Sequence, residues 1–162
     1  MTFHTALPSI AEARTATFAA LGEAVALLSE SPLHRDRSIG QIAALILPPL
    51  MEGQLRLWHR GGRPVALATW AWLDAETEAR VLLRDHLPGA DEWSGGPNPV
   101  IIDFVAPFGD AFAVARDLKR TVFPDRAMSS VRRDASGRRL RIVQHPGRDA
   151  LGRPVKASAI AA

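Results

Sequence analysis

Apolar residues recur at helical intervals near the start of the chain. The series comprises Ile10, Ala13, Phe18, Leu21, Val25 and Leu28. It predicts a first helix over about residues 10–29. Ser9 followed by Glu12 has the spacing of a capping box at the start of this helix. Ser31-Pro32 is then expected to break it.

A second apolar series follows Ser38 and places Ile39, Ile42, Ala43, Ile46 and Leu47 on one helical face. We expect this helix to end at Pro48-Pro49, because proline lacks an amide donor and restricts the residue before it. His34 would therefore lie in the connection between two helices.

From Leu55 apolar residues stand at alternate positions, which is the period of a strand. Gly61-Gly62 can supply the positive φ angles of a tight turn, and residues 64–72 form a second extended run. Two further extended runs, 127–132 and 138–144, flank a turn-forming segment. The sequence thus predicts two β-hairpins.

Between the two hairpins the sequence predicts a helix and a central strand. Asp74 can cap a short helix that reaches about Asp85. Residues 100–105 are apolar apart from Asp103, which is typical of a strand buried on both faces. A charge there costs several kcal/mol unless it is paired or hydrogen-bonded, so Asp103 needs a partner, functional or structural.

After this strand, Pro107 and Gly109 turn the chain and Asp110 opens another helix. The period of that helix indicates a core-facing side with Phe112, Ala115 and Leu118, and a polar side with Arg116, Lys119 and Arg120. The order of elements predicts one α/β (α+β) domain over residues 1–145, a mixed, largely antiparallel sheet flanked by helices. Residues 146–162, rich in Gly, Pro, Arg and Ala, are expected to form a flexible tail.

Composition narrows the chemistry. The chain has no cysteine, which excludes disulfides, thiolate metal sites and cysteine nucleophiles, and no metal site is expected. No apolar run approaches a membrane span and the first 20 residues lack a signal-peptide pattern, so we expect a cytoplasmic protein without stable membrane insertion. Residues 126–156 carry eight arginines and one lysine against two aspartates, a local balance of +7.

Two segments contain residues that chemistry needs and packing does not. They are Ser31-Pro32-Leu33-His34-Arg35 and the run from Ile101 to Asp110, which includes Ile102-Asp103-Phe104 and Pro107-Phe108-Gly109-Asp110. With Pro64-Val65-Ala66, Thr69-Trp70-Ala71 and Trp93-Ser94-Gly95, they resemble the toxin-activating lysine-acyltransferase family, cytoplasmic enzymes that fatty-acylate RTX toxin precursors. The resemblance covers roughly residues 25–133 and implies a fold similar to that of GCN5-related acetyltransferases.

The resemblance implies a protein-lysine N-acyltransferase with a catalytic pair, His34 and Asp103. Histidine can take the proton of the acceptor amine, and a carboxylate can fix its tautomer. Whether the histidine acts as a base or first accepts the acyl group stays open. Alternatively, His34 is a surface or capping histidine and Asp103 pairs with a buried arginine.

The same resemblance implies the substrates: acyl carrier protein as donor, with no bound cofactor, and an RTX-type protoxin as acceptor. Residues predicted to bind substrate are Ser31, Trp93, Gly109, Asp110, Arg116, Lys119 and Arg120. The glycine turn before a helix can hold the phosphate of a phosphopantetheine arm, and the basic residues can meet an acidic carrier. Simple turn geometry and a solvated helix face are the alternatives. Homodimers are a further implication.

The sequence departs from the family at two positions. Members generally have an asparagine on the helix after the histidine motif, and the aligned residue here is Leu45. They also have an aromatic residue soon after the histidine, where this chain has Arg37 or nearby polar residues. A weakened, carrier-binding or regulatory module is therefore the second hypothesis. Nucleic-acid binding through the arginine-rich end ranks last, because no helix-turn-helix signature or stacking platform accompanies the charge.

Overall fold

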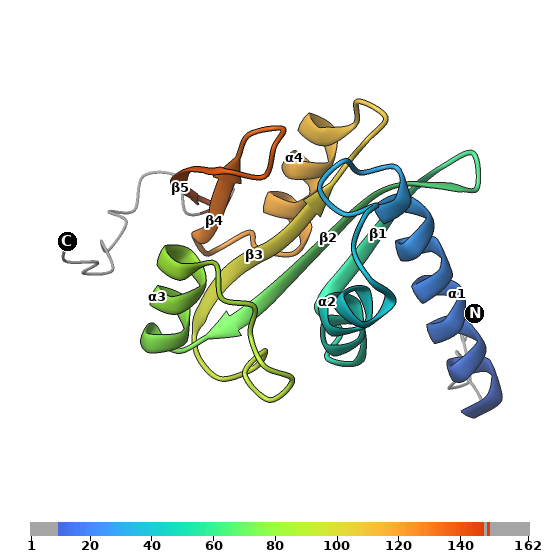
Figure 1. Ribbon diagram of the computed structural model, residues 1–162, viewed down its shortest axis with the longest axis horizontal. Helices are drawn as coiled ribbons and strands as arrows, with labels where there is room; N and C mark the ends of the chain where they lie inside the picture. The colour runs from blue at the N-terminus through green and yellow to red at the C-terminus, as the bar shows by residue number, and fades with distance from the viewer. Residues whose placement is uncertain (1–9, 148, 150–162) are drawn as a thin grey trace, which may run out of the picture.

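The computed structural model describes residues 10–147 and 149, which form one mixed α/β domain (Figure 1). Its helices are α1 (Ile10–Ser29), α2 (Ile39–Met51), α3 (Ala75–Arg84) and α4 (Ala111–Thr121). Its strands are β1 (Leu55–Arg60), β2 (Arg63–Leu73), β3 (Asn98–Val105), β4 (Met128–Arg133) and β5 (Arg139–His145). The predicted cap at Ser9 and most of the predicted tail lie outside the described residues.

The five strands form one sheet in the order β1-β2-β3-β4-β5. Every neighbouring pair is antiparallel except β3 and β4, which are parallel. The predicted α/β class, with a largely antiparallel sheet, is confirmed, and β3 is the central strand.

Helices cover both faces of the sheet. Alternate residues of β2 point to opposite faces, and Leu67 packs against α1 and α2, while Leu73 packs against α3. Trp70 points the other way and packs with Leu118 of α4 and with Phe123. Thus α1, α2 and α3 share one face, which we call the three-helix face, and α4 covers the other.

Both predicted hairpins are confirmed. Gly61 and Gly62 at the β1–β2 turn have φ angles of 57° and 76°, a region that glycine enters without steric cost. Gly137, with φ at 84°, serves the β4–β5 turn in the same way. Asp74 caps α3 as predicted, because its side chain accepts a hydrogen bond from the amide of Thr77.

Two local predictions are wrong. Helix α2 begins after Ser38, whose side chain forms a capping box with Gln41, but it continues through Pro48 and Pro49 to Met51. Proline fixes φ near the helical value, and in this last turn the carbonyls of Pro48 and Pro49 still accept hydrogen bonds from Glu52 and Gln54.

The second error concerns the face of α4. Leu118 is buried as predicted, but Phe112 is 75% exposed. The guanidinium of Arg116 lies 4.9 Å from the centre of the Phe112 ring, a cation–π contact at the surface. Val114 takes the buried position expected of Phe112, so the apolar face of α4 is rotated relative to the predicted one.

Candidate active site

His34 is held between two oxygen atoms. Its Nε2 lies 2.7 Å from Asp103 Oδ1, and its Nδ1 lies 2.7 Å from Ser31 Oγ. The His34 side chain is 5% exposed and that of Asp103 is 13% exposed. The structure therefore brings together the predicted catalytic pair and the predicted Ser31, from segments that are 69 residues apart in the sequence.

Consecutive turns at the end of α1 place His34. The amide of Ser31 donates to the carbonyl of Leu28, and the amides of His34 and Arg35 donate to the carbonyl of Ser31. The chain thus doubles back within a few residues, so the Ser31 hydroxyl and the His34 ring, three positions apart, face each other. This explains why both belong to one short sequence motif.

A β-bulge orients Asp103. Thr69 of β2 pairs with Asp103 and Trp70 pairs with Ile101, so Ile102 is an extra residue without a partner on β2. In a regular strand Ile102 and Asp103 would point to opposite faces. Because of the bulge, both reach the three-helix face, where Ile102 packs against its apolar clusters and Asp103 meets His34. The Thr69 hydroxyl also accepts a hydrogen bond from the amide of Asp103.

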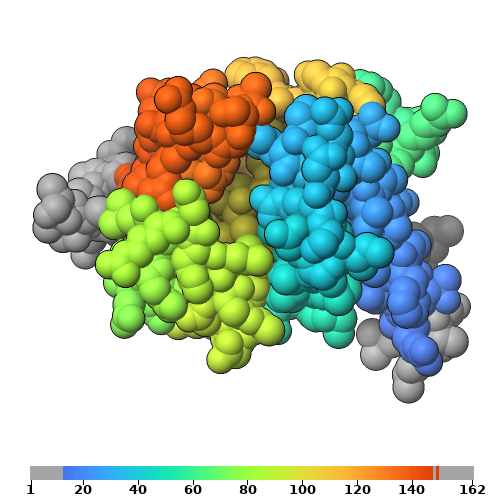
Figure 2. All heavy atoms as spheres, viewed as in Figure 1, coloured from blue at the N-terminus to red at the C-terminus, as the bar shows by residue number. Residues whose placement is uncertain are grey.

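The sheet opens beside this pair. Strand β3 pairs with β2 along its length, but it pairs with β4 only at Val100 and Ile101. Beyond Ile101 the two parallel strands separate, and a cleft of about 580 Å³ contains both His34 and Asp103 in its lining. Figure 2 shows this hollow between the β4–β5 hairpin in orange and the segments around the α1–α2 connection in blue and cyan.

The β4–β5 hairpin forms one wall of the cleft and is held to the end of α3 by ion pairs. Asp85, at the end of α3, bonds the guanidinium groups of Arg133 and Arg139, which lower the pKa of its carboxyl. At the hairpin turn, a side-chain carbon added to Gly137 would lie 3.4 Å from Leu33. The turn therefore approaches the α1–α2 connection across the cleft.

The partners of His34 define its tautomer. An ionised Asp103 can only accept, so Nε2–H of His34 donates to it. In neutral histidine the other nitrogen is then an acceptor, so the Ser31 hydroxyl donates to Nδ1. The second oxygen of Asp103, Oδ2, is buried and has no hydrogen-bond partner among the described residues. Such a buried pair with open space beside it is suited to general acid–base chemistry.

The other residues predicted to bind substrate lie elsewhere. Trp93 is fully buried in the cluster below α3. Gly109, with φ at 89°, turns the chain before α4, and Asp110 pairs with Arg60 at 2.7 Å. Arg116, Lys119 and Arg120 lie on α4, on the opposite face of the sheet from His34. None of these six residues lines the cleft that contains His34 and Asp103.

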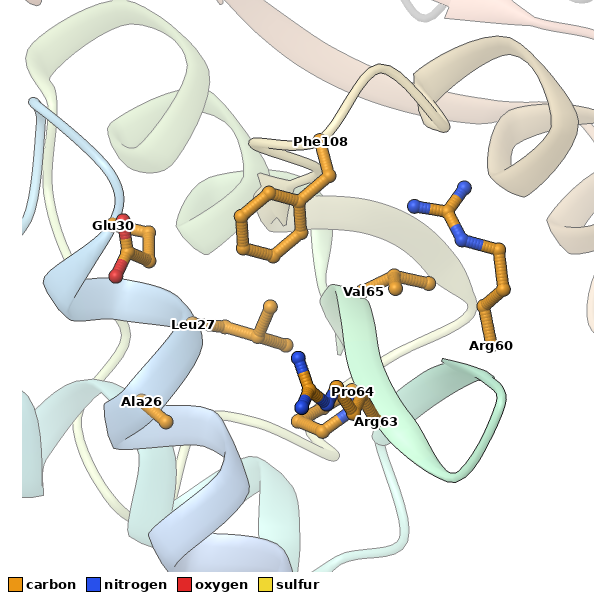
Figure 3. A pocket seen from close by; sticks show the side chains of 8 residues that line it. All are labelled: Ala26, Leu27, Glu30, Arg60, Arg63, Pro64, Val65 and Phe108. Carbon is orange, nitrogen blue, oxygen red and sulfur yellow. The ribbon is translucent and has the colours of Figure 1, made fainter.

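A second cavity of about 490 Å³ lies between the end of α1, the β1–β2 hairpin and the turn after β3. Figure 3 shows Leu27, Val65 and Phe108 around its centre, with Arg60 and Arg63 on the hairpin side and Glu30 on α1. His34 and Asp103 do not line it. Chemistry at the pair therefore belongs to the first cleft.

Sequence reasoning did not find the residues that shape the cleft. Val81, Leu87, Asp85 and Arg133 line it together with Leu45, which the sequence singled out only as a departure. The apolar members have the periodicity of ordinary core positions. Residues 100–105 are apolar at every position except 103, so the sequence has no alternation from which the bulge at Ile102 could be predicted.

The described residues contain no group of three or more histidines, aspartates or glutamates arranged to hold a metal ion. None of the helices that the structure describes is long and apolar enough to cross a membrane. The site described above brings together a histidine, a hydroxyl and a carboxylate, a set suited to acid–base group transfer.

Comparison with known proteins agrees with this class. The model of the RTX toxin acyltransferase family matches residues 13–146. The RTX-I toxin-activating lysine-acyltransferase ApxIC of Actinobacillus pleuropneumoniae is 36% identical over 121 residues, covering 75% of this chain and 70% of the relative. The protein-lysine palmitoyltransferase CyaC of Bordetella bronchiseptica is 36% identical over 128 residues, covering 79% of this chain and 65% of the relative. The protein-lysine myristoyltransferase HlyC of Escherichia coli is 34% identical over 114 residues, covering 70% of this chain and 66% of the relative.

The protein is therefore an acyltransferase. It belongs to the RTX toxin acyltransferase family, as the resemblance predicted from the sequence. The matched region includes α1 from residue 13 onward, the other three described helices and all five strands.

Proposed function

We propose that this chain moves a fatty acyl group from acyl carrier protein to the side-chain amine of an internal lysine in an RTX-type protoxin. The observation that carries the proposal is the buried Ser31–His34–Asp103 arrangement at the open side of β3. The relatives named above are toxin-activating, palmitoyl- and myristoyl-transferring enzymes, which supports a fatty acyl donor and a lysine acceptor.

The acceptor amine needs help to lose its proton. A lysine with a pKa of about 10.4 is neutral in only about one molecule in 2,500 at pH 7, a deficit of roughly 4.6 kcal/mol. His34 would act as the base at Nδ1, with the Ser31 hydroxyl relaying the proton, since that hydroxyl already occupies Nδ1. Asp103 would stabilise the imidazolium through Oδ1 and accept a hydrogen bond from the incoming ammonium at Oδ2.

In direct transfer the neutral amine attacks the thioester carbonyl, a C–N bond forms and the C–S bond breaks. The carrier thiolate takes the proton held by His34, and the neutral His34 then accepts the second proton that the nitrogen loses as the amide forms and releases it to water. In the alternative, Nδ1 of His34 attacks first and the acyl group passes through an acyl-imidazole to the amine, after the thiol has left. The second course requires the Ser31 hydroxyl to leave Nδ1.

The carrier protein would meet the basic surface formed by Arg116, Lys119 and Arg120 on α4, which lies across the sheet from His34, so its phosphopantetheine arm would have to reach around the sheet to the cleft. Arg116 and Arg120 are exposed, and the turn through Gly109 and Asp110 precedes the same helix. An acidic partner bound in this way would dissociate as salt rises, because exposed charges are screened.

The experiment is incubation of the purified chain with palmitoyl-loaded acyl carrier protein and an RTX-type protoxin, followed by intact mass of the protoxin. The expected result is a gain of one palmitoyl group per modified lysine, lost with His34→Ala and kept with His59→Ala. Carrier binding without any mass gain in the protoxin would instead favour the non-catalytic module. An acylated enzyme trapped in the absence of protoxin would select the acyl-histidine course.

A further inference from the structure

Two apolar clusters share the three-helix face without merging. One contains Leu45 of α2 together with residues of α1, and the other contains Val81 and Leu82 of α3. Leu87 and Ile102 pack against both clusters, and both are only partly buried. We call this boundary the α2–α3 seam, defined by Leu45, Val81, Leu87 and Ile102.

The seam opens into the catalytic cleft. All four of its residues line the same cavity as His34 and Asp103. Leu45 and Val81 are almost fully buried, whereas Arg37 and Ser136, which line the same cavity, are exposed. The cleft therefore combines exposed polar residues with buried apolar ones that line it together with the catalytic pair.

We propose that the α2–α3 seam holds the hydrocarbon chain of the acyl donor and that Val81 and Leu45 limit the chain length it accepts. This rests on the proposed function, since it assumes a fatty acyl donor. The occupant is a hydrocarbon chain because the seam offers apolar side chains from three elements, α2, α3 and β3, and the catalytic pair borders it. Each methylene that leaves water there favours binding, so a longer chain binds more tightly as long as the seam can hold it.

The second cavity fits this occupant less well. It has an apolar centre at Leu27, Val65 and Phe108, but neither His34 nor Asp103 lines it (Figure 3). A chain placed there would leave its carbonyl away from the histidine. This cavity nevertheless supplies a matched control, because Val65 and Val81 are both 8% exposed.

The test is a competition among carriers loaded with octanoyl, dodecanoyl, palmitoyl and stearoyl groups, read by the masses of the acylated protoxin. Val81→Phe narrows the seam, and we expect the palmitoyl-to-octanoyl product ratio to fall about tenfold or more, with octanoyl transfer retained. Val65→Phe should give the same palmitoyl-to-octanoyl product ratio as the parent protein. An unchanged ratio in Val81→Phe, with native circular dichroism, would overturn the proposal.

Leu45→Ala gives the opposite change and serves if Val81→Phe fails to fold. It lengthens the seam, so the ratio of stearoyl to palmitoyl product should rise severalfold over that of the parent protein. An unaltered ratio would overturn the seam as the chain site while leaving acyl transfer intact. Absence of transfer from every carrier by the parent protein would instead overturn the proposed function, and the seam assignment with it.

Discussion

Two histidine–carboxylate pairs in this molecule have nearly the same geometry and very different surroundings. His34 Nε2 lies 2.7 Å from Asp103, and His59 Nε2 lies 2.8 Å from Glu23. The first pair is buried, whereas His59 and Glu23 are 42% and 36% exposed. His34 also has a hydroxyl on its second ring nitrogen and a cleft beside it.

The difference shows that the distance between the two side chains does not mark a site by itself. An exposed pair is weakened by water and salt and contributes little to stability or chemistry. Burial strengthens the field of the carboxylate on the histidine, and the opening between β3 and β4 gives a substrate access to it. We therefore propose chemistry at the pair beside the bulge and none at the pair on the α1–β1 surface.

The largest expected effect comes from replacing the two histidines in the same way. His34→Gln keeps a polar side chain of similar size but removes the base, so the rate of acyl transfer should fall about 10²- to 10⁴-fold. His59→Gln should transfer at the parent rate. The mass of the protoxin after fixed times measures the transfer rate of both variants. Equal losses of rate would show that burial does not determine which histidine takes part in acyl transfer.

A smaller loss is expected when the histidine loses only its hydroxyl partner. Ser31→Ala frees Nδ1 of His34 and removes the proposed relay, so kcat should fall about ten- to hundredfold. The matched control is Ser38→Ala, which removes the cap of α2 and costs about 1 kcal/mol of stability. Steady-state kinetics and urea denaturation separate the two, and a normal kcat in Ser31→Ala would remove the serine from the mechanism.

The smallest expected effect is on stability and concerns Glu78, a buried carboxyl whose hydrogen-bond partners are Ser129 and Asn98 and not a histidine. Burial raises the pKa of Glu78, although hydrogen bonds from Ser129 and Asn98 oppose the shift. Because its pKa is higher in the folded state, its stabilising contribution is present at acid pH and is lost as pH rises through the raised pKa. Glu78→Gln should therefore gain stability at pH 8 relative to the parent protein and little at pH 4, by urea denaturation. Parallel pH profiles would contradict this.

Most of the fold could be predicted from the sequence, because periodicity and turn residues act locally. The helix after Asp74, the glycine turn at Gly61 and the apolar strand around Asp103 are all confirmed. The continuation of α2 through Pro48 could not be read, since it depends on partners for the last carbonyls rather than on proline itself. The exposure of Phe112 depends on which side of α4 the sheet covers, which is a tertiary property.

For the site, the motifs predicted the His34–Asp103 pair, and the structure explains it by turns at Ser31 and a bulge at Ile102. The cleft could not be predicted. It exists because β4 pairs with β3 over only two residues. This pairing joins segments that are far apart in the sequence, and the hydrophobic periodicity of neither segment indicates it. The roles of Trp93 and of the basic residues on α4 stay predictions, since they lie apart from the pair.

The most direct measurement of the central claim compares the two carboxylates. Single-turnover transfer of palmitate to the protoxin, followed by intact mass, should be slowed at least about a hundredfold by Asp103→Asn, because the amide no longer stabilises the imidazolium. Glu23→Gln, in the exposed pair, should react at the parent rate. Transfer at the parent rate by Asp103→Asn would contradict the account, because the buried pair would then not be the site of chemistry.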